Sequence, residues 1–265
     1  MNNRMKIAAL LLGAVLILAV SIWGPEAMSR YQDKGLMNEI HAETVEAAGE
    51  GYLYKLNANE KLYILSRCLI SQSAVGSGQG AGTQLDDSYA FVANYRSPSD
   101  KEISDDQIYE TCNAAIGLLK EAGILPEEIR EVLPASYDAT LYSAIDVLEP
   151  RNNIAVWKLS LSNSQVNADK ANRLMDAYIG AEDGKLYEFY VRTPLRWEEI
   201  DTDDIIAKWS DYMGLGSAAP YESDNPLLET TPYYKKYVFP GMSSDKTIVT
   251  IGFYEGINEL FLKIS

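Results

Sequence analysis

The sequence predicts an α+β protein with two helix-plus-antiparallel-sheet units outside a membrane and one N-terminal transmembrane helix. Residues 7–23 form an uncharged apolar run that is unmatched elsewhere in the chain. Behind it, a helix pattern followed by several strand patterns occurs twice, over residues 104–194 and 195–265. Tyrosine outnumbers phenylalanine 18 to 5, and tyrosine suits the half-exposed face of an antiparallel sheet.

The apolar run is long enough to approach the thickness of a membrane. As a helix, residues 7–23 span about 25 Å, slightly less than the ~30 Å hydrocarbon core of a bilayer. Arg4 and Lys6 precede the run, so the positive-inside rule places the N-terminus in the cytoplasm and the bulk outside. We therefore expect residues 1–25 to be an uncleaved signal-anchor with a short cytoplasmic N-terminus. The alternative is a cleaved signal peptide and a secreted protein, for which residues 19–21 offer a weak cleavage sequence.

The net charge and the number of cysteines restrict which partners and how many disulfides this chain can have. The formal net charge is −15, which repels nucleic acid, so we expect no nucleic-acid partner. The two cysteines, Cys68 and Cys112, are too few for a disulfide scaffold. Both lie on apolar helix faces, so we expect two separate buried thiols. One disulfide in an oxidising compartment remains the alternative.

Two segments lead from the anchor to the first unit. Residues 26–50 are polar and are expected to be a juxtamembrane connector. Residues 51–103 are expected to hold a helix over Leu56–Ile70, a glycine-rich loop over Gly76–Gly82 and a strand over Ser88–Tyr95. The helix should begin with a capping box of Asn57 and Glu60 and bury Leu62, Leu65 and Leu69. The glycine spacing does not match a phosphate-binding loop, so a flexible loop is expected.

The first unit begins with the clearest helix. Ser104 is expected as its N-cap and Gly123 as its end. Its apolar face comprises Ile108, Cys112, Ala115 and Leu119. The expected strands are 139–148, 153–161, 175–179 and 186–192. Within the second strand, alternation places Trp157 on one face with its neighbours Ala155 and Leu159, and we expect this face to pack under the helix. An exposed, ligand-binding Trp157 is the alternative.

The second unit repeats the order. Thr202 is expected to cap a helix over Asp203–Gly214. Its apolar face comprises Ile205, Ile206, Trp209 and Met213. Three strands are expected over 233–239, 247–254 and 260–264. Tyr233–Tyr237 mixes tyrosines with two lysines, which is typical of a protected edge strand.

Residues 104–193 resemble a PepSY-type module. The resemblance depends on the helix over Ile108–Gly123, the strand around Trp157, and the hairpin from Asp176-Ala-Tyr-Ile through Gly184-Lys-Leu-Tyr-Glu-Phe. Residues 202–264 resemble a degenerate second copy. An anchor followed by such modules is similar to the membrane-anchored YycH/YycI-like extracytoplasmic regulators. The resemblance implies binding and modulation of a partner protein, such as a sensor kinase, a peptidase or an envelope enzyme.

No pattern of catalytic, cofactor-binding or metal-binding residues is found. His41 is the single histidine and lies in the expected connector, a poor position for nucleophilic catalysis. Residues 198–204 contain five acids, which we interpret as helix capping and solubility, with a calcium site as the alternative. We therefore expect a non-enzymatic protein that needs no cofactor and binds another membrane or envelope protein. The alternatives are an envelope hydrolase with paired carboxylates and a wall- or lipid-binding module.

Overall fold

The computed structural model describes residues 56–76, 88–134, 137–161, 171–222 and 231–265. The expected membrane helix, the connector with His41 and nearly all of the glycine-rich loop lie outside these residues. Among the helices that are described, none is long and apolar enough to cross a membrane.

The described residues form the expected α+β protein. The helices are α2 (Ala58–Gly76), α3 (Ile108–Glu121) and α4 (Thr202–Met213), with short 3-10 turns η1 (Trp197–Glu199) and η3 (Glu255–Ile257). The strands are β1 (Tyr89–Ala93), β2 (Asp138–Asp146), β3 (Asn153–Ser160), β4 (Arg173–Gly180), β5 (Leu186–Arg192), β6 (Ala219–Tyr221), β7 (Tyr234–Pro240), β8 (Lys246–Tyr254) and β9 (Glu259–Ile264).

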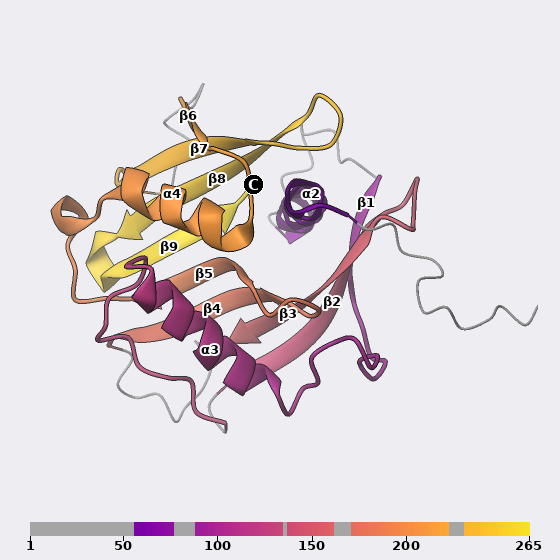
Figure 1. Ribbon diagram of the computed structural model, residues 1–265, viewed down its shortest axis with the longest axis horizontal. Coiled ribbons are helices and arrows are strands. Elements are labelled where there is room, and N and C mark those ends of the chain that lie inside the picture. The colour runs from indigo at the N-terminus through magenta and orange to yellow at the C-terminus, as the bar shows by residue number, and fades with distance from the viewer. Residues whose placement is uncertain (1–55, 77–87, 135–136, 162–170, 223–230) are drawn as a thin grey trace, which may run out of the picture. The chain divides into compact units, whose positions relative to one another are not determined.

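All the described strands belong to one antiparallel sheet, in the order β1-β2-β3-β4-β5-β9-β8-β7-β6. The expected order is present twice, because α3 precedes β2 to β5 and α4 precedes β6 to β9. The last strand of each set, β5 and β9, pair with each other in the middle of the sheet. The two sets therefore share one sheet, with β1 added beyond β2 (Figure 1).

Helices α3 and α4 lie in front of the same side of the sheet in Figure 1. Trp157, on this face, is only 4% exposed, and its Nε1 donates to the carbonyl of Ile103 ahead of α3 at 2.9 Å. In the other half, the ring of Trp209 on α4 meets the ring of Phe239 on β7 edge-on. The prediction that Trp157 belongs to the core is confirmed.

Helix α2 is buried more completely than an ordinary surface helix. Leu62, Ile64 and Leu65 are fully buried. The helix contacts β1, β2 and β3 from one half of the sheet and β8 and β9 from the other. Its expected capping box is confirmed, since Asn57 N donates to Glu60 at 2.8 Å and Glu60 N donates to Asn57 Oδ1 at 3.0 Å.

Two of the expected helix caps are wrong. Gln107, not Ser104, is the N-cap of α3, and its side chain makes no capping hydrogen bond. Asp201, not Thr202, caps α4, because its carboxylate accepts from the N–H groups of Asp203 and Asp204 at 3.1 Å each. A carboxylate also stabilises the positive end of the helix dipole, which a threonine hydroxyl does not.

The edge of the second half was also predicted incorrectly. β7, which contains Tyr234–Tyr237, is not an edge strand, because β6 pairs with it on the outside. β6 has only the residues Ala219–Tyr221 and includes Pro220, so no alternating pattern signals it. Lys235 does not protect an edge, because its Nζ forms an ion pair with Asp203 at 2.6 Å.

Trp157→Ala should destabilise the fold. Removing this buried side chain should lower the free energy of unfolding by about 3–5 kcal/mol. Thermal unfolding of the full chain in detergent, followed by circular dichroism, measures the effect. Tyr95→Ala is the control, because Tyr95 is 97% exposed and its loss should leave the midpoint unchanged. An unchanged midpoint for Trp157→Ala would contradict a core role.

Candidate functional site

Acids of residues 198–204, which suggested a calcium site, form hydrogen bonds and ion pairs with groups of the protein itself. Asp201 caps α4. Asp203 bonds with Lys235 and accepts from the Tyr237 hydroxyl at 2.7 Å, and Asp204 pairs with Lys208. Within the described ranges, no three His, Cys, Asp or Glu side chains are grouped to hold a metal ion. These contacts support helix capping and ion pairing as the role of the cluster.

Both cysteines are buried thiols. Cys68 Sγ donates to the carbonyl of Ala90 at 3.3 Å, while Cys112 lies on the buried side of α3. Neither forms a disulfide, as expected. Burial raises the pKa of each thiol to about 12, so neither is a reactive thiolate at neutral pH.

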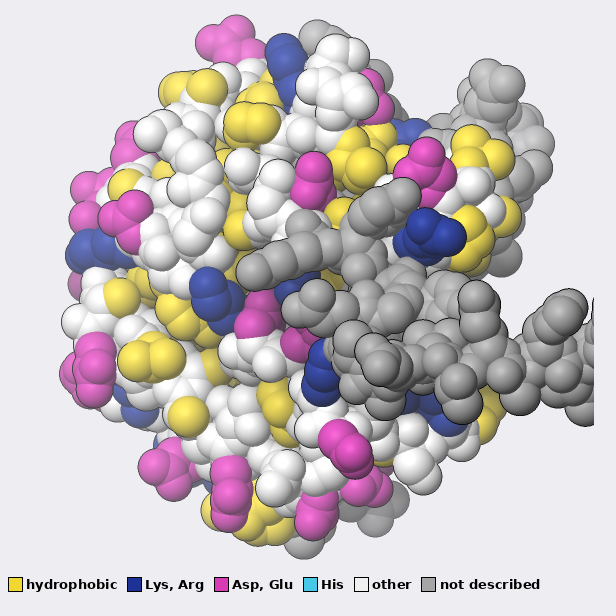
Figure 2. Space-filling view, turned by 45° about the vertical axis from the view of Figure 1, so that its right-hand side comes forward, with side chains coloured by type: hydrophobic (Ala, Val, Ile, Leu, Met, Phe, Trp, Pro, Cys, Tyr) yellow, Lys and Arg dark blue, Asp and Glu magenta, His cyan; other side chains and the backbone are white. Residues whose placement is uncertain are grey.

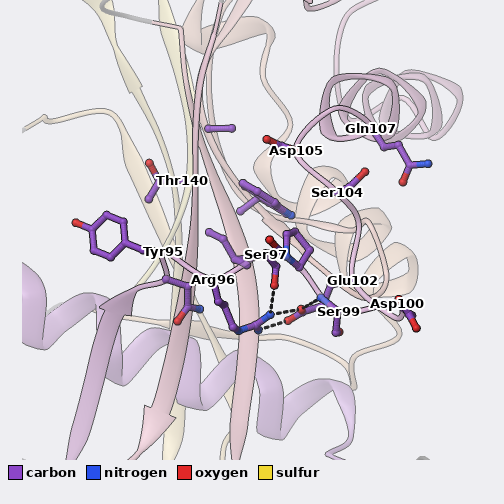
Figure 3. Close-up of a pocket in the computed structure, with 15 residues that line it drawn as sticks. Tyr95, Arg96, Ser97, Ser99, Asp100, Glu102, Ser104, Asp105, Gln107 and Thr140 are labelled. Atoms are coloured by element: carbon purple, nitrogen blue, oxygen red, sulfur yellow. Dashed lines mark hydrogen bonds and ion pairs between the residues drawn. The ribbon is translucent and has the colours of Figure 1, made fainter.

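One cavity lies between β2, β3 and the loop that follows β1 (Figure 3). Its volume is about 810 Å³, within the range of ligand-binding clefts. Ala139, Leu141 and Trp157 supply apolar lining from the strands. The loop over 94–105 supplies most of the polar lining, together with the apolar side chains of Tyr95 and Pro98. The sequence did not indicate this cavity, because it forms only when the loop folds back onto strands that are distant in the chain.

An ion pair fixes the loop of this cavity. Arg96 binds both carboxylate oxygens of Glu102, at 2.7 and 2.6 Å (Figure 3). Glu102 also accepts from Ser99 N at 2.7 Å. These bonds hold the pKa of Glu102 down at about 2, so it is ionised at neutral pH and has no proton to donate. Glu102 therefore lacks the protonation state of a general acid.

The face of the sheet opposite to Trp157 carries many aromatic side chains. Among the aromatic residues that strand register places on this side, six are linked by ring contacts: Phe91, Tyr142, Tyr178, Tyr190, Tyr254 and Phe261. We call this set the aromatic face. Tyr178 and Phe261 are buried and the other four are half-buried. The expectation that tyrosines line the second face of the sheet is confirmed.

The aromatic face is ordered by ring contacts. Phe91 stacks on Tyr142 with centroids 4.5 Å apart and planes within 3° of parallel. Phe261 stacks on Tyr190 and on Tyr254, with centroid separations of 5.7 and 4.8 Å. The side chains are therefore held in fixed orientations by one another, which lowers the entropy lost when a partner binds.

Charges of both signs lie among these rings. Lys158 Nζ is 5.8 Å from the centroid of the Tyr178 ring. Arg192 and Glu259 form an ion pair at 3.8 Å across β5 and β9. Figure 2, turned 45° from the view of Figure 1, presents a different side of the molecule, on which hydrophobic, acidic and basic side chains are also interspersed. The tyrosines among these charges match the enrichment of aromatic residues at protein interfaces.

Glu188 is a buried carboxyl on the same side of the sheet. It accepts from Ile264 N at 2.9 Å, at the end of β9. Burial raises its pKa to about 7, while this hydrogen bond and the nearby Lys263 and Lys158 favour the ionised form. The sequence showed Glu188 only as one acid in an alternating strand, so its burial was not predicted.

Comparison of the chain with protein-family models, with curated proteins and with solved structures found no match.

Glu188→Gln should change the pH dependence of stability. The pKa of Glu188 is about 7 in the folded state and ~4.3 in an unfolded chain. Its contribution to stability is therefore complete below pH ~4.3 and is lost as pH rises through about 7. Glutamine keeps an acceptor for Ile264 N without a charge.

Chemical denaturation from pH 4 to 8 measures this effect. Glu188→Gln should gain stability over the wild type as pH rises and should show a flatter profile. Glu121→Gln, at an exposed position on α3, is the control and should follow the wild-type profile. Parallel profiles for Glu188→Gln and the wild type would contradict the buried, proton-binding carboxyl.

Proposed function

We propose that this chain is a non-enzymatic, membrane-anchored extracytoplasmic protein that binds and modulates a partner protein through its aromatic face. The observation that carries the proposal is the set of stacked, half-buried tyrosines on one side of the sheet. Tyrosine is enriched at protein interfaces because it combines a large apolar ring with a hydroxyl that can form hydrogen bonds. The partner is a membrane or envelope protein, such as a sensor kinase, a peptidase or an envelope enzyme.

The two sets of elements are proposed to be PepSY-like units. The repeated order of one helix and four strands supports this, as does the β4–β5 hairpin, whose turn ends at Gly184 with φ of +65°. The likeness to YycH/YycI-like regulators adds the expectation of a protein partner. Anchoring through residues 7–23 rests on the uncharged run behind Arg4 and Lys6. Secretion after cleavage is the competing outcome.

The alternative of an envelope hydrolase requires a carboxyl that donates a proton and a carboxylate, facing each other across a cleft. The cavity contains Glu102, which is held ionised by Arg96. The carboxyl whose pKa is raised to about 7, Glu188, is buried on the opposite side of the sheet from Trp157. This separation favours binding over acid–base catalysis. The cavity itself keeps the wall-binding alternative open to test.

Photo-crosslinking tests the aromatic face in living cells. p-Benzoylphenylalanine at position 142, in the full chain, should give a discrete adduct with one partner. The same reagent at position 118, an exposed position on α3 on the opposite side of the sheet, should not. Tyr190→Ser should lower the yield of the position-142 adduct at least about tenfold, as expected for an interface hot spot. Equal adducts from both positions, or none from position 142, would contradict the proposal.

Labelling of an introduced cysteine tests the topology. Ser265→Cys should react with a membrane-impermeant maleimide on intact cells after removal of the wall. The two native thiols are buried and provide a low background. Reaction only after lysis would place the C-terminal part in the cytoplasm and refute the extracytoplasmic assignment.

A further inference from the structure

The two edges of the sheet differ in how well they resist pairing with another strand. At one edge, β6 has three residues, one of which is Pro220. Short strands and proline are common devices that block edge pairing. At the other edge, β1 has five residues, Tyr-Ala-Phe-Val-Ala, without proline or charge. Edge strands of this composition are templates for strand addition.

The outer main-chain groups of β1 can be assigned from its hydrogen bonds. Asn94 N donates to Leu141 O at 2.8 Å, and Val147 N donates to Ser88 O at 2.7 Å. Along an antiparallel strand, successive residues direct their main-chain N–H and C=O groups alternately toward and away from a neighbouring strand. Phe91 and Ala93 therefore point these groups away from β2. Within the part of the chain that the structure describes, no main-chain group pairs with Phe91 or Ala93 on that side.

The side chains beside this edge are apolar and accessible. Val92 is 47% exposed, and Tyr95, just beyond the strand, is 97% exposed. On the other side of the strand, Phe91 belongs to the aromatic face through its stack on Tyr142. An added strand would therefore place side chains beside Val92 on one side and beside Phe91 on the other. The edge and the aromatic face form one continuous surface.

We propose that an extended segment of the partner protein adds to β1 as a further strand, with apolar residues at its centre and lysines or arginines at its ends. This inference rests on the proposed function and specifies how the partner binds. Basic ends complement the formal net charge of −15 of this chain. The same charge repels a second copy.

Variants of the edge separate strand addition from loss of folding. Ala93→Pro removes an outward N–H while the β1–β2 hydrogen bonds remain, and Ala93→Ser is its control, since serine keeps that N–H. Val92→Lys adds a charge at the edge. Its control is Val147→Lys, at a position with almost the same exposure, 48%, in the turn after β2.

The readout is the adduct from p-benzoylphenylalanine at position 142 in the full chain. Ala93→Pro and Val92→Lys should each lower its yield at least fivefold, and the two control variants should leave it unchanged. Unchanged adducts in Ala93→Pro and Val92→Lys would overturn strand addition while the proposed function stands. Absence of an adduct in the parent chain would refute both. The melting temperature of each variant shows whether it is folded. If Ala93→Pro is misfolded, the adduct yield of Val92→Lys decides whether strand addition stands.

A synthetic peptide tests the main-chain pairing directly. It alternates valine and threonine and carries lysines at both ends. It should slow hydrogen exchange of residues 88–95 in the full chain in detergent. The same peptide with alternate amides N-methylated should have no effect, because it lacks the donors that pair with β1. Equal protection by both peptides, or by neither, would contradict the proposal.

Discussion

The pairing of β5 with β9 is the interaction on which the arrangement of this protein depends. Four residue pairs, from Phe189 with Leu262 to Arg192 with Glu259, join the first set of strands to the second. Without this ladder the chain would have two small sheets, each with an additional open edge. Because β5 and β9 are the last strands of their sets, the final strand of each half lies at the centre of the sheet, with a neighbouring strand on both sides.

Beyond one end of the β5–β9 ladder, side chains rather than main-chain groups form the hydrogen bonds between the two halves. Leu186, at the start of β5, lies beyond the last pair with β9. Its N–H donates to the Tyr212 hydroxyl at 3.0 Å, and its carbonyl accepts from Trp209 Nε1 at 3.2 Å, so both groups are satisfied by α4 of the second half. Ile264 N, at the end of β9, is satisfied by Glu188 of the first half. These cross-half bonds satisfy buried main-chain groups that would otherwise destabilise the fold.

The junction also makes the aromatic face continuous. Tyr190 and Phe261 are directly opposite each other on β5 and β9 and stack across the boundary. Tyr254, on β8, extends this stack into the second half. In the first half, Phe91 and Tyr142 extend the face to the edge at β1. The proposed partner site is therefore assembled from residues far apart in the sequence.

Local features of the fold could be predicted from sequence, and long-range pairing could not. The stripe of Leu62 and Leu65, the buried Trp157 and the helix end at Gly214, with φ of +74°, follow from periodicity and backbone preference. Asp201 and Thr202 are adjacent and both residue types are favoured at an N-cap, so the sequence did not decide which of them caps α4. Which strands neighbour each other depends on tertiary contacts, so neither the β5–β9 junction nor the cavity near Trp157 had a local signal.

A disulfide across the junction tests the central claim most directly. Arg192 and Glu259 are opposite each other and do not exchange main-chain hydrogen bonds, since the next pair is bonded through Thr193 N and Asn258 O. Such pairs have Cα atoms ~4.5 Å apart, close enough for a disulfide. Arg192→Cys with Glu259→Cys should oxidise within one chain. Arg192→Cys with Lys263→Cys, displaced along β9, should not. Equal oxidation of both pairs, or none, would contradict the single joined sheet.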